Sequence, residues 1–340
     1  MATSSSPLVN ALTMGEPAGI GGELTVKTWA KHRGSLTPFV ALDDADRLRA
    51  IAAALGLDVH IQIVKSTAEA VDIFADALPV LPLKASAQTT PGKPSPETAA
   101  AVIESITRAV LLVRAGEASA VVTNPIQKDT LYAAGFKFPG HTEYLGDLDG
   151  GALPVMMLAS PMLRVVPVTV HVPLRTALDT LSTESIVTQG RMVIEALRRD
   201  FGVAAPRLAV AGLNPHAGEA GTLGDDEDRI IRPAIKALQD LDADVFGPVP
   251  PDALFTPRAR DGYDAALCMY HDQALIPIKA LDVDRAVNVT LGLSFVRTSP
   301  DHGTAFDIAA KGVADPASLR TAFDYAIRLR QAARPWPAQP

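Results

Sequence analysis

Three histidines lie at or just beyond the ends of short apolar runs, where the strands of an α/β sheet would end: His171, His216 and His271. They are too far apart in the sequence to form a local zinc-finger motif, so the fold would have to assemble any shared site. Three imidazoles that leave further coordination positions open would suit a divalent metal that acts as a Lewis acid on a substrate oxygen. Spacing alone leaves a second interpretation open, in which each histidine is a hydrogen-bonded side chain near a strand end.

Two loops carry residue types that can bind an anion. Residues 15–23 (GEPAGIGGE) join an apolar run to a helix; the glycines permit close backbone approach, and the helix start offers free N–H groups. Because this sequence is neither G-x-G-x-x-G nor a Walker A motif, it can equally be a structural turn. Residues 140–143 (GHTE) could present His141 and Thr142 to a phosphate or carboxylate, or could start a helix with Thr142 as its cap.

A further group combines a lysine, an amide and an arginine. Lys279, Asn288 and Arg297 lie around a strand-like segment, residues 286–296. Arginine offers a planar fork and lysine a point charge, so with the amide they could hold an anionic substrate. Taken one at a time, each is also compatible with a solvated surface position.

Apolar runs alternate with amphipathic helical patterns along most of the chain, which predicts βαβ units and a largely parallel sheet. We expect strands over 8–14 and 119–123, and helices over 23–32, 184–201, 225–239 and from Ser95 to about Gly116. Pro233 should limit or kink the helix over 225–239, and residues 79–96 predict an exposed loop. In open α/β sheets ligands bind beyond the carboxyl ends of the strands, so the polar clusters that follow the apolar runs predict a common cleft.

The composition is that of a globular protein of 340 residues, 48% hydrophobic and 20% charged, and this length predicts two domains or two lobes. The net charge of −7 argues against non-specific binding to nucleic acid. The only cysteine, Cys268, lies in an apolar run and fits a buried position in a reducing compartment. Prolines interrupt the most membrane-like stretch, residues 151–174, and residues 1–9 lack an export signal, so we expect a cytoplasmic protein that does not bind membranes.

Five motifs in order resemble the 4-hydroxythreonine-4-phosphate dehydrogenase family of pyridoxal phosphate biosynthesis. They are GEPAGIGGE at 15–23, GHTE at 140–143, GLNPHAGE at 212–219, MYHDQ at 269–273 and NVTLGLSFVRTSPDHG at 288–303. The resemblance runs from about residue 8 to residue 311, nearly the whole chain. A weaker resemblance, at residues 302–312, is to the adenosine-side loop of isocitrate and isopropylmalate dehydrogenases, which belong to the same fold superfamily.

The resemblance implies a two-lobed α/β/α subunit of the isocitrate/isopropylmalate dehydrogenase-like type, with the active site in the interlobe cleft. The expected cofactor-side lobe comprises residues 1–138 and 288–340, and the expected metal, substrate and dimerisation lobe comprises residues 139–287. The resemblance also implies a homodimer whose metal site draws histidines from both subunits.

The resemblance also assigns roles to residues. The implied metal ligands are His171, His216 and His271; the substrate-binding residues are His141, Thr142, Lys279, Asn288 and Arg297; and the cofactor loop contributes Gly303, Thr304 and Asp307. Beside these, the candidate catalytic residues are Lys279, Asp252 and Asp272, and the two aspartates could either orient a metal ligand or transfer a proton. The implied cofactors are NAD or NADP and one divalent ion per active site. Histidine ligands favour zinc, cobalt or manganese, while added substrate oxygens would also admit magnesium.

The implied reaction is metal-dependent oxidation of 4-phosphohydroxy-L-threonine at C3, followed by decarboxylation to 3-amino-2-oxopropyl phosphate. Two alternatives stay open. One is a sister dehydrogenase that acts on threonate or erythronate 4-phosphate or on a cis-dihydrodiol carboxylate. The other is a non-enzymatic sugar-phosphate or metal-binding protein on the same fold, since fold alone does not fix function.

Overall fold

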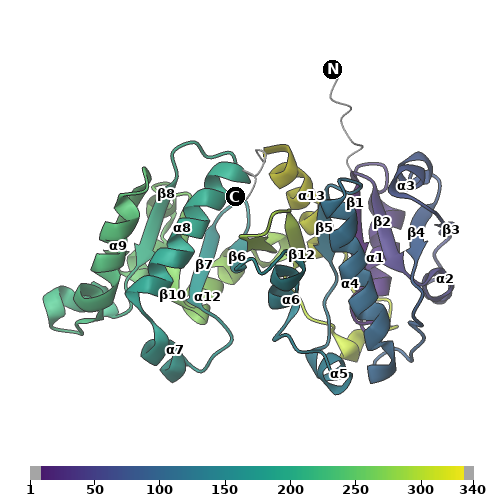
Figure 1. Cartoon of the computed structure of the whole chain (residues 1–340), viewed down its shortest axis with the longest axis horizontal. Helices are drawn as coiled ribbons and strands as arrows, with labels where there is room; N and C mark the ends of the chain where they lie inside the picture. The colour runs from purple at the N-terminus through teal and green to yellow at the C-terminus, as the bar shows by residue number, and fades with distance from the viewer. Residues whose placement is uncertain (1–8, 333–340) are drawn as a thin grey trace. The chain divides into compact units, whose positions relative to one another are not determined.

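The computed structural model describes residues 9–332, which form two compact units (Figure 1). Of the described residues, unit 1 comprises 9–154 and 293–331, and unit 2 comprises 155–292 and Ala332. The mixed α/β fold predicted from the alternating pattern is confirmed. The units divide near residues 154 and 292, whereas the lobes expected from the sequence divide near 138 and 288; the roles assigned to those lobes stay a prediction.

The strands of unit 1 lie in the order β3–β4–β2–β1–β5–β12, and each neighbouring pair is parallel. The strands are β1 Asn10–Thr13, β2 Phe39–Asp43, β3 Ile61–Ile63, β4 Leu78–Pro82, β5 Ala120–Thr123 and β12 Arg297–Pro300. The helices are α1 Gly21–His32, α2 Ala45–Ala54, α3 Thr67–Ile73, η1 Pro96–Thr98, α4 Ala99–Arg114, α5 Lys128–Ala133, α6 His141–Leu148, η5 Phe306–Ile308 and α13 Ala317–Ala332. Figure 1 shows α4 lying along this sheet, where it contacts β1, β2 and β5.

The strands of unit 2 lie in the order β11–β6–β7–β10–β8–β9. They are β6 Val155–Ala159, β7 Arg164–Thr169, β8 Arg207–Ala211, β9 Asp244–Val249, β10 Ala265–Tyr270 and β11 Val287–Leu291. The helices are α7 Leu174–Thr180, α8 Thr183–Arg199, η2 Pro215–Gly221, η3 Glu227–Ile231, α9 Arg232–Gln239, α10 Pro251–Leu254, α11 Pro257–Arg260, α12 His271–Asp282 and η4 Val283–Arg285. Strands β7, β10, β8 and β9 pair in parallel, whereas β6 pairs antiparallel with β7 and β11. The turn between β6 and β7 is too short for a parallel crossover, which explains this reversal.

Local sequence signals set several element ends as predicted. The Ser95 side chain accepts a hydrogen bond from the Glu97 amide at 3.3 Å, and Pro96 opens the short 3₁₀ turn that leads into α4. Pro233 lies in the first turn of α9, where its missing N–H costs nothing, and a π-helical turn, η3, precedes it. Cys268 is fully buried in β10, and its burial raises the pKa of the thiol, as a core position requires.

One alternative for residues 140–143, and the first part of the loop expected over 79–96, are wrong. Thr142 does not cap α6, because the helix begins one residue earlier with Gly140 at the N-cap and no side chain caps it. Residues 78–82 form the mostly buried strand β4 and are not part of an exposed loop, because Leu78, Val80 and Leu81 pack in the core between β2 and β3. Residues 151–174 contain β6 and β7, and no described helix is long and apolar enough to cross a membrane.

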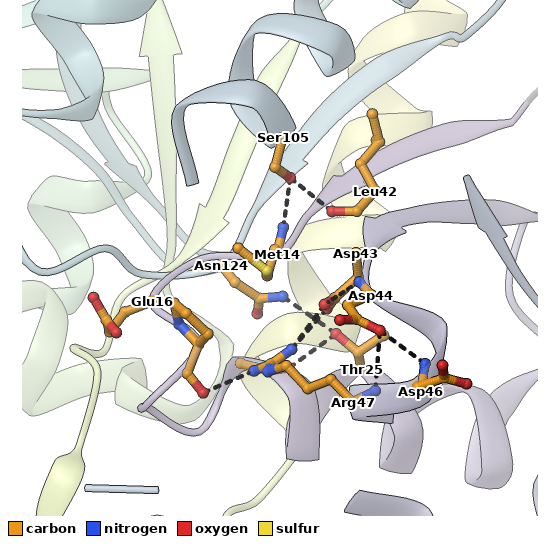
Figure 2. A network of polar contacts seen from close by, with 12 residues as sticks. Met14, Glu16, Thr25, Leu42, Asp43, Asp44, Asp46, Arg47, Ser105 and Asn124 are labelled. Atoms are coloured by element: carbon orange, nitrogen blue, oxygen red, sulfur yellow. Dashed lines mark hydrogen bonds and ion pairs between the residues drawn. The ribbon is translucent and has the colours of Figure 1, made fainter. Parts of the chain in front are cut away.

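A buried serine links three elements of unit 1. The Ser105 hydroxyl, on α4, accepts a hydrogen bond from the Met14 amide at 2.9 Å and donates one to the Leu42 carbonyl at 2.7 Å (Figure 2). Ser105 is 0% exposed, so no water can replace these bonds. The hydroxyl therefore fixes α4 against the carboxyl ends of β1 and β2.

Replacing Ser105 with alanine should lower the free energy of unfolding by about 1–3 kcal/mol, because two buried backbone groups would lose this partner. Urea denaturation of purified protein, followed by circular dichroism, measures the change. The matched control is Ser35→Ala, which removes an exposed hydroxyl that bonds only to the His32 carbonyl. Equal urea midpoints for the two variants would contradict the structural role of Ser105.

Candidate active site

Two of the three strand-end histidines lie together in unit 2. His171 follows β7 and His271 begins α12 directly after β10, and these strands are parallel neighbours with Thr169 opposite Tyr270. The Thr169 hydroxyl donates a hydrogen bond to the Met269 carbonyl at 3.0 Å, which ties the two strand ends. The ring centres of His171 and His271 are 5.6 Å apart, and both rings line a pocket of about 190 Å³.

The separation of the His171 and His271 rings is compatible with binding of one metal ion by both. Two imidazoles bound to one tetrahedral ion have ring centres roughly 5 Å apart when each metal–nitrogen bond is about 2.0–2.1 Å. The observed 5.6 Å is close to that separation. The Nδ1 atom of His271 lies 2.7 Å from Oδ1 of Asp272, and a carboxylate in this position leaves Nε2 as the ligand atom.

His216 is placed differently. It lies on η2 after β8, is exposed, and does not line the pocket of His171 and His271. Within residues 9–332, no three His, Cys, Asp or Glu side chains are grouped as a metal site would require. The structure of one chain therefore brings together two of the three predicted ligands.

The backbone of the loop that carries His216 is left-handed. Residues 216–220 have φ values between 41° and 82°, and of these residues only Gly218 is a glycine. A left-handed residue other than glycine costs roughly 1–2 kcal/mol, so surrounding contacts must hold this turn. One contact comes from Gln273 of the MYHDQ motif, whose Nε2 donates to the Gly212 carbonyl at 2.7 Å. Its Oε1 accepts from the Met269 amide at 2.7 Å, so one buried amide joins the ends of β8 and β10.

Unit 1 holds a separate cationic group. Arg297, at the start of β12, is 4% exposed, and its Nη2 donates to the Thr123 hydroxyl at 2.6 Å. Burial lowers the pKa of Arg297 to about 10, so the guanidinium still carries its charge at neutral pH. The side chain is therefore a fixed positive charge at the carboxyl end of β5.

The imidazole of His141 lies in the same electrostatic environment. Burial, followed by the positive charges of Arg297 and Lys128, holds the pKa of His141 well below its usual range. The Nε2 atom is buried and has no hydrogen-bond partner among the described residues. His141 is consequently a neutral group that can donate or accept a hydrogen bond beside a cation, and Thr142 follows it on α6.

The remaining predicted residues are distributed over both units. In unit 2, Lys279 lies exposed on α12, and Asn288 lies on β11 with its Oδ1 buried and without a partner among the described residues. Asp272 lines the histidine pocket, whereas Asp252 is exposed on α10 and does not line that pocket. Sequence reasoning missed Lys128, whose only signal was its position in the polar segment after β5.

The predicted cofactor loop of unit 1 packs against the glycine-rich motif. The Ile20 amide donates to the Thr304 carbonyl at 3.1 Å, and a Cβ at position 19 would lie 2.7 Å from that oxygen, so only glycine fits there. The Lys27 ammonium donates to the carbonyls of Gly312 and Ala314, each at 2.8 Å. These bonds hold a segment that contains Gly303, Thr304 and Asp307.

A buried ion pair holds the other side of the motif. The Arg47 guanidinium donates to both carboxylate oxygens of Asp43 at 2.9 Å and to the Pro17 carbonyl at 3.0 Å (Figure 2). The motif is thus fixed from two sides by protein groups, which agrees with the structural interpretation of residues 15–23.

Known proteins are similar to this chain over almost its whole length. A sequence model of the family "Pyridoxal phosphate biosynthetic protein PdxA" matches residues 35–326. A 4-hydroxythreonine-4-phosphate dehydrogenase of Bradyrhizobium diazoefficiens is 52% identical, over 95% of this chain and 97% of its own length.

Two solved structures are also similar. A 4-hydroxythreonine-4-phosphate dehydrogenase from Klebsiella pneumoniae is 38% identical with a TM-score of 0.85, covering 96% of this chain and 100% of its own. A terephthalate 1,2-cis-dihydrodiol dehydrogenase from Burkholderia xenovorans is 28% identical with a TM-score of 0.62, covering 92% of this chain and 95% of its own. From the family match and these identities, the chain belongs to the pyridoxal phosphate biosynthetic protein PdxA family, that of the 4-hydroxythreonine-4-phosphate dehydrogenases.

Proposed function

We propose that this chain oxidises 4-phosphohydroxy-L-threonine at C3 with NAD or NADP and decarboxylates the product to 3-amino-2-oxopropyl phosphate, in pyridoxine 5'-phosphate biosynthesis. The name shared by the relatives supports this substrate. The observation in the structure that carries the proposal is the His171–His271 pair in one strand-end pocket, because open α/β sheets bind their ligands beyond the carboxyl ends of the strands.

The metal ligands in this proposal are His171, His216 and His271, with one divalent ion (zinc, cobalt, manganese or magnesium) per active site. When bound, the ion supplies a Lewis acid for the C3 hydroxyl oxygen, while NAD or NADP supplies the hydride acceptor. The contribution of the chain is to orient its ligands: Asp272 fixes the ring of His271 through Nδ1. The bond from Thr169 to Met269 keeps the two strand ends in register.

The substrate-binding residues in this proposal are those that the family resemblance assigns. Arg297 provides a permanent charge and a planar fork, and the neutral ring of His141 adds a hydrogen bond without adding charge. Thr142, Lys279 and Asn288 complete the set that the family resemblance assigns to the substrate. Fixed donors of this kind orient the C3 hydrogen toward the nicotinamide.

The cofactor loop and the proton-transfer groups complete the proposal. Gly303, Thr304 and Asp307 bind the adenosine side of NAD or NADP, on a segment that the motif at 15–23 holds in place. Of the proton-transfer candidates Lys279, Asp252 and Asp272, Asp272 is supported by its position in the histidine pocket.

A second candidate function is oxidation of a cis-dihydrodiol carboxylate. The similarity to the terephthalate 1,2-cis-dihydrodiol dehydrogenase favours it, because Arg297 and His141 could hold a carboxylate as well as a phosphate. Threonate or erythronate 4-phosphate would satisfy the same donors.

The proposed assembly is a cytoplasmic homodimer that binds neither nucleic acid nor membrane. His171 and His271 neighbour each other on one chain, so we infer that His216 of a second copy supplies the third ligand. Closed two-fold symmetry then gives two equivalent sites per dimer.

Turnover assays distinguish the candidate substrates. With NAD or NADP and zinc, cobalt or manganese, 4-phosphohydroxy-L-threonine should give reduced cofactor and carbon dioxide. Its kcat/KM should be at least tenfold higher than that of threonate 4-phosphate, because recognition of the substrate amine adds a polar contact of roughly 1–3 kcal/mol. Exhaustive chelation is the control and should abolish turnover. If threonate 4-phosphate or a dihydrodiol carboxylate is oxidised faster, the proposed substrate is wrong and the faster compound takes its place.

Subunit mixing tests the shared site. His216→Ala and His271→Ala should each be inactive as separate proteins. After subunit exchange the mixture should regain up to about a quarter of wild-type activity, because half of the dimers become mixed and one of their two sites is intact. Differently tagged chains show that exchange has occurred. Exchange without recovered activity would place all the ligands of one site in one chain.

Arg297→Lys tests the anion contact. Lysine keeps the charge and loses the planar fork. The kcat/KM for the substrate should therefore fall, mainly through a higher substrate KM, by a factor that corresponds to a loss of about 2–4 kcal/mol in transition-state stabilisation. The KM for NAD should stay near that of the wild type. Arg114→Lys, an exposed exchange of the same kind in unit 1, is the control. Substrate kinetics within twofold of wild type, or a change in the NAD constant alone, would contradict the role given to Arg297.

A further inference from the structure

We propose that Glu227 is the positioning residue of His216: its buried carboxylate holds the left-handed loop that presents this imidazole to the metal. The inference rests on the proposed function, in which His216 is a metal ligand. It assigns a task to a carboxylate that does not itself contact a metal, substrate or cofactor.

Glu227 binds the chain immediately before His216. It begins the π-helical turn η3 and is 2% exposed. Its Oε1 accepts hydrogen bonds from the amides of Leu213 at 2.8 Å and Asn214 at 2.7 Å, and its Oε2 accepts one from the Asn214 side-chain amide at 3.0 Å. Both carboxylate oxygens are therefore directed at the two residues where β8 turns into η2.

The carboxylate fits closely because two loop positions are glycine. A Cβ at Gly218 would lie 2.6 Å from Oε2 of Glu227, and a Cβ at Gly212 would lie 3.4 Å from Oε1. Gly212 and Gly218 stand on either side of His216 in the sequence. The loop thus wraps around the Glu227 carboxylate on both sides of the proposed ligand.

Hydrogen bonds of this kind explain how the strained turn persists. Residues 216–220 are left-handed, and inside the loop the Ala217 amide donates to the Asn214 carbonyl at 3.1 Å. Charge-assisted bonds from a buried carboxylate are about twice as strong as neutral ones, so they can fix Asn214 and hence the direction of the turn. Without them, the backbone at Pro215 and His216 could relax to an ordinary conformation, and the imidazole would point elsewhere.

In the described part of the chain, the Glu227 carboxylate forms no ion pair that would compete with its hydrogen bonds to the loop. No lysine or arginine pairs with Glu227 there, whereas the half-buried Asp226 and the exposed Asp228 form ion pairs with the exposed Arg229 and Arg232. Asp226 also accepts a bond from Asn214 Nδ2 at 3.1 Å, at the edge of the same contact. Glu227 is the buried member of this acidic run, and its bonds go to the loop.

Cobalt binding to the full-length protein tests the inference. We would measure the Co²⁺ dissociation constant by equilibrium dialysis, together with the visible absorption spectrum, which reports the geometry of the ligands. Glu227→Ala should weaken Co²⁺ binding by about 10- to 100-fold and change the spectrum, as loss of a group that orients a ligand does. Glu227→Gln keeps one acceptor oxygen and should give an intermediate loss. Asp228→Asn, which alters the adjacent exposed carboxylate, should bind Co²⁺ like the wild type.

The binding results of the Glu227 and His216 variants distinguish failure of the positioning role from failure of the metal assignment. If Glu227→Gln, folded by circular dichroism, binds Co²⁺ with wild-type affinity and spectrum, the inference is wrong, including in the case that Glu227→Ala does not fold. His216→Ala, measured beside them, tests the proposed function. If it keeps wild-type affinity, His216 is not a ligand, and both the metal assignment and this inference fall. If it loses the metal while the Glu227 variants retain it, only the positioning role is overturned.

Discussion

The position of His171 beside His271, the two candidate metal ligands, depends on the parallel pairing of β7 with β10. Two strands that run in the same direction end at the same edge of a sheet, so the residues that follow them meet regardless of their distance in the sequence. Thr169 and Met269 are 100 residues apart and are joined by a hydrogen bond at this edge. His171 and His271 follow directly, and the register of the pair brings their rings to a separation that one ion can bridge. The connection through α8 and β8 is the long crossover that a parallel pair requires.

The parts of this arrangement that follow from local chemistry could be predicted from the sequence. Apolar runs predicted β1 and β5. Ser95, Pro96 and Gly116 marked the two ends of the predicted helix that contains α4. The left-handed turn at His216 could not be predicted, because Pro-His-Ala-Gly-Glu-Ala has no propensity for such a conformation and tertiary contacts impose it. Burial of Glu227 was hidden for the same reason: in a run of acidic residues it has the appearance of a solvated side chain until the loop at 212–214 closes on it. The partner that would complete the metal site proposed above is likewise not encoded in the periodicity of one chain.

In unit 1, the sequence predicted which residue types could bind an anion, but the charge that each of them carries depends on its environment in the fold. The sequence identified Arg297 and His141 as anion-binding types, but it could not predict that burial would leave one charged and the other neutral. The difference comes from intrinsic pKa values: the same desolvation that keeps an imidazole neutral is far too weak to discharge a guanidinium at neutral pH. Lys128 strengthens the effect on His141 from a neighbouring element. The result is one permanent charge next to one uncharged hydrogen-bonding ring, which suits an anion better than two cations that repel each other.

Both glycine-rich motifs in this chain make room for another protein group. At Gly19 the close neighbour is the Thr304 carbonyl, and at Gly218 it is the Glu227 carboxylate. Thr304 belongs to the proposed cofactor loop, and Glu227 holds the loop that carries His216. Each glycine therefore affects a proposed functional residue indirectly, by allowing a second segment to approach closely. The two histidines at His171 and His216 also have left-handed backbones, with φ of 51° and 52°. Such residues persist only where the surroundings over-determine them, and both lie in the segments that follow parallel strands, His171 after β7 and His216 on η2 after β8. Buried hydrogen bonds at the strand ends, such as those that Gln273 makes to Gly212 and Met269, therefore help to hold these turns, so the direction of each imidazole depends on the scaffold as well as on the residue type.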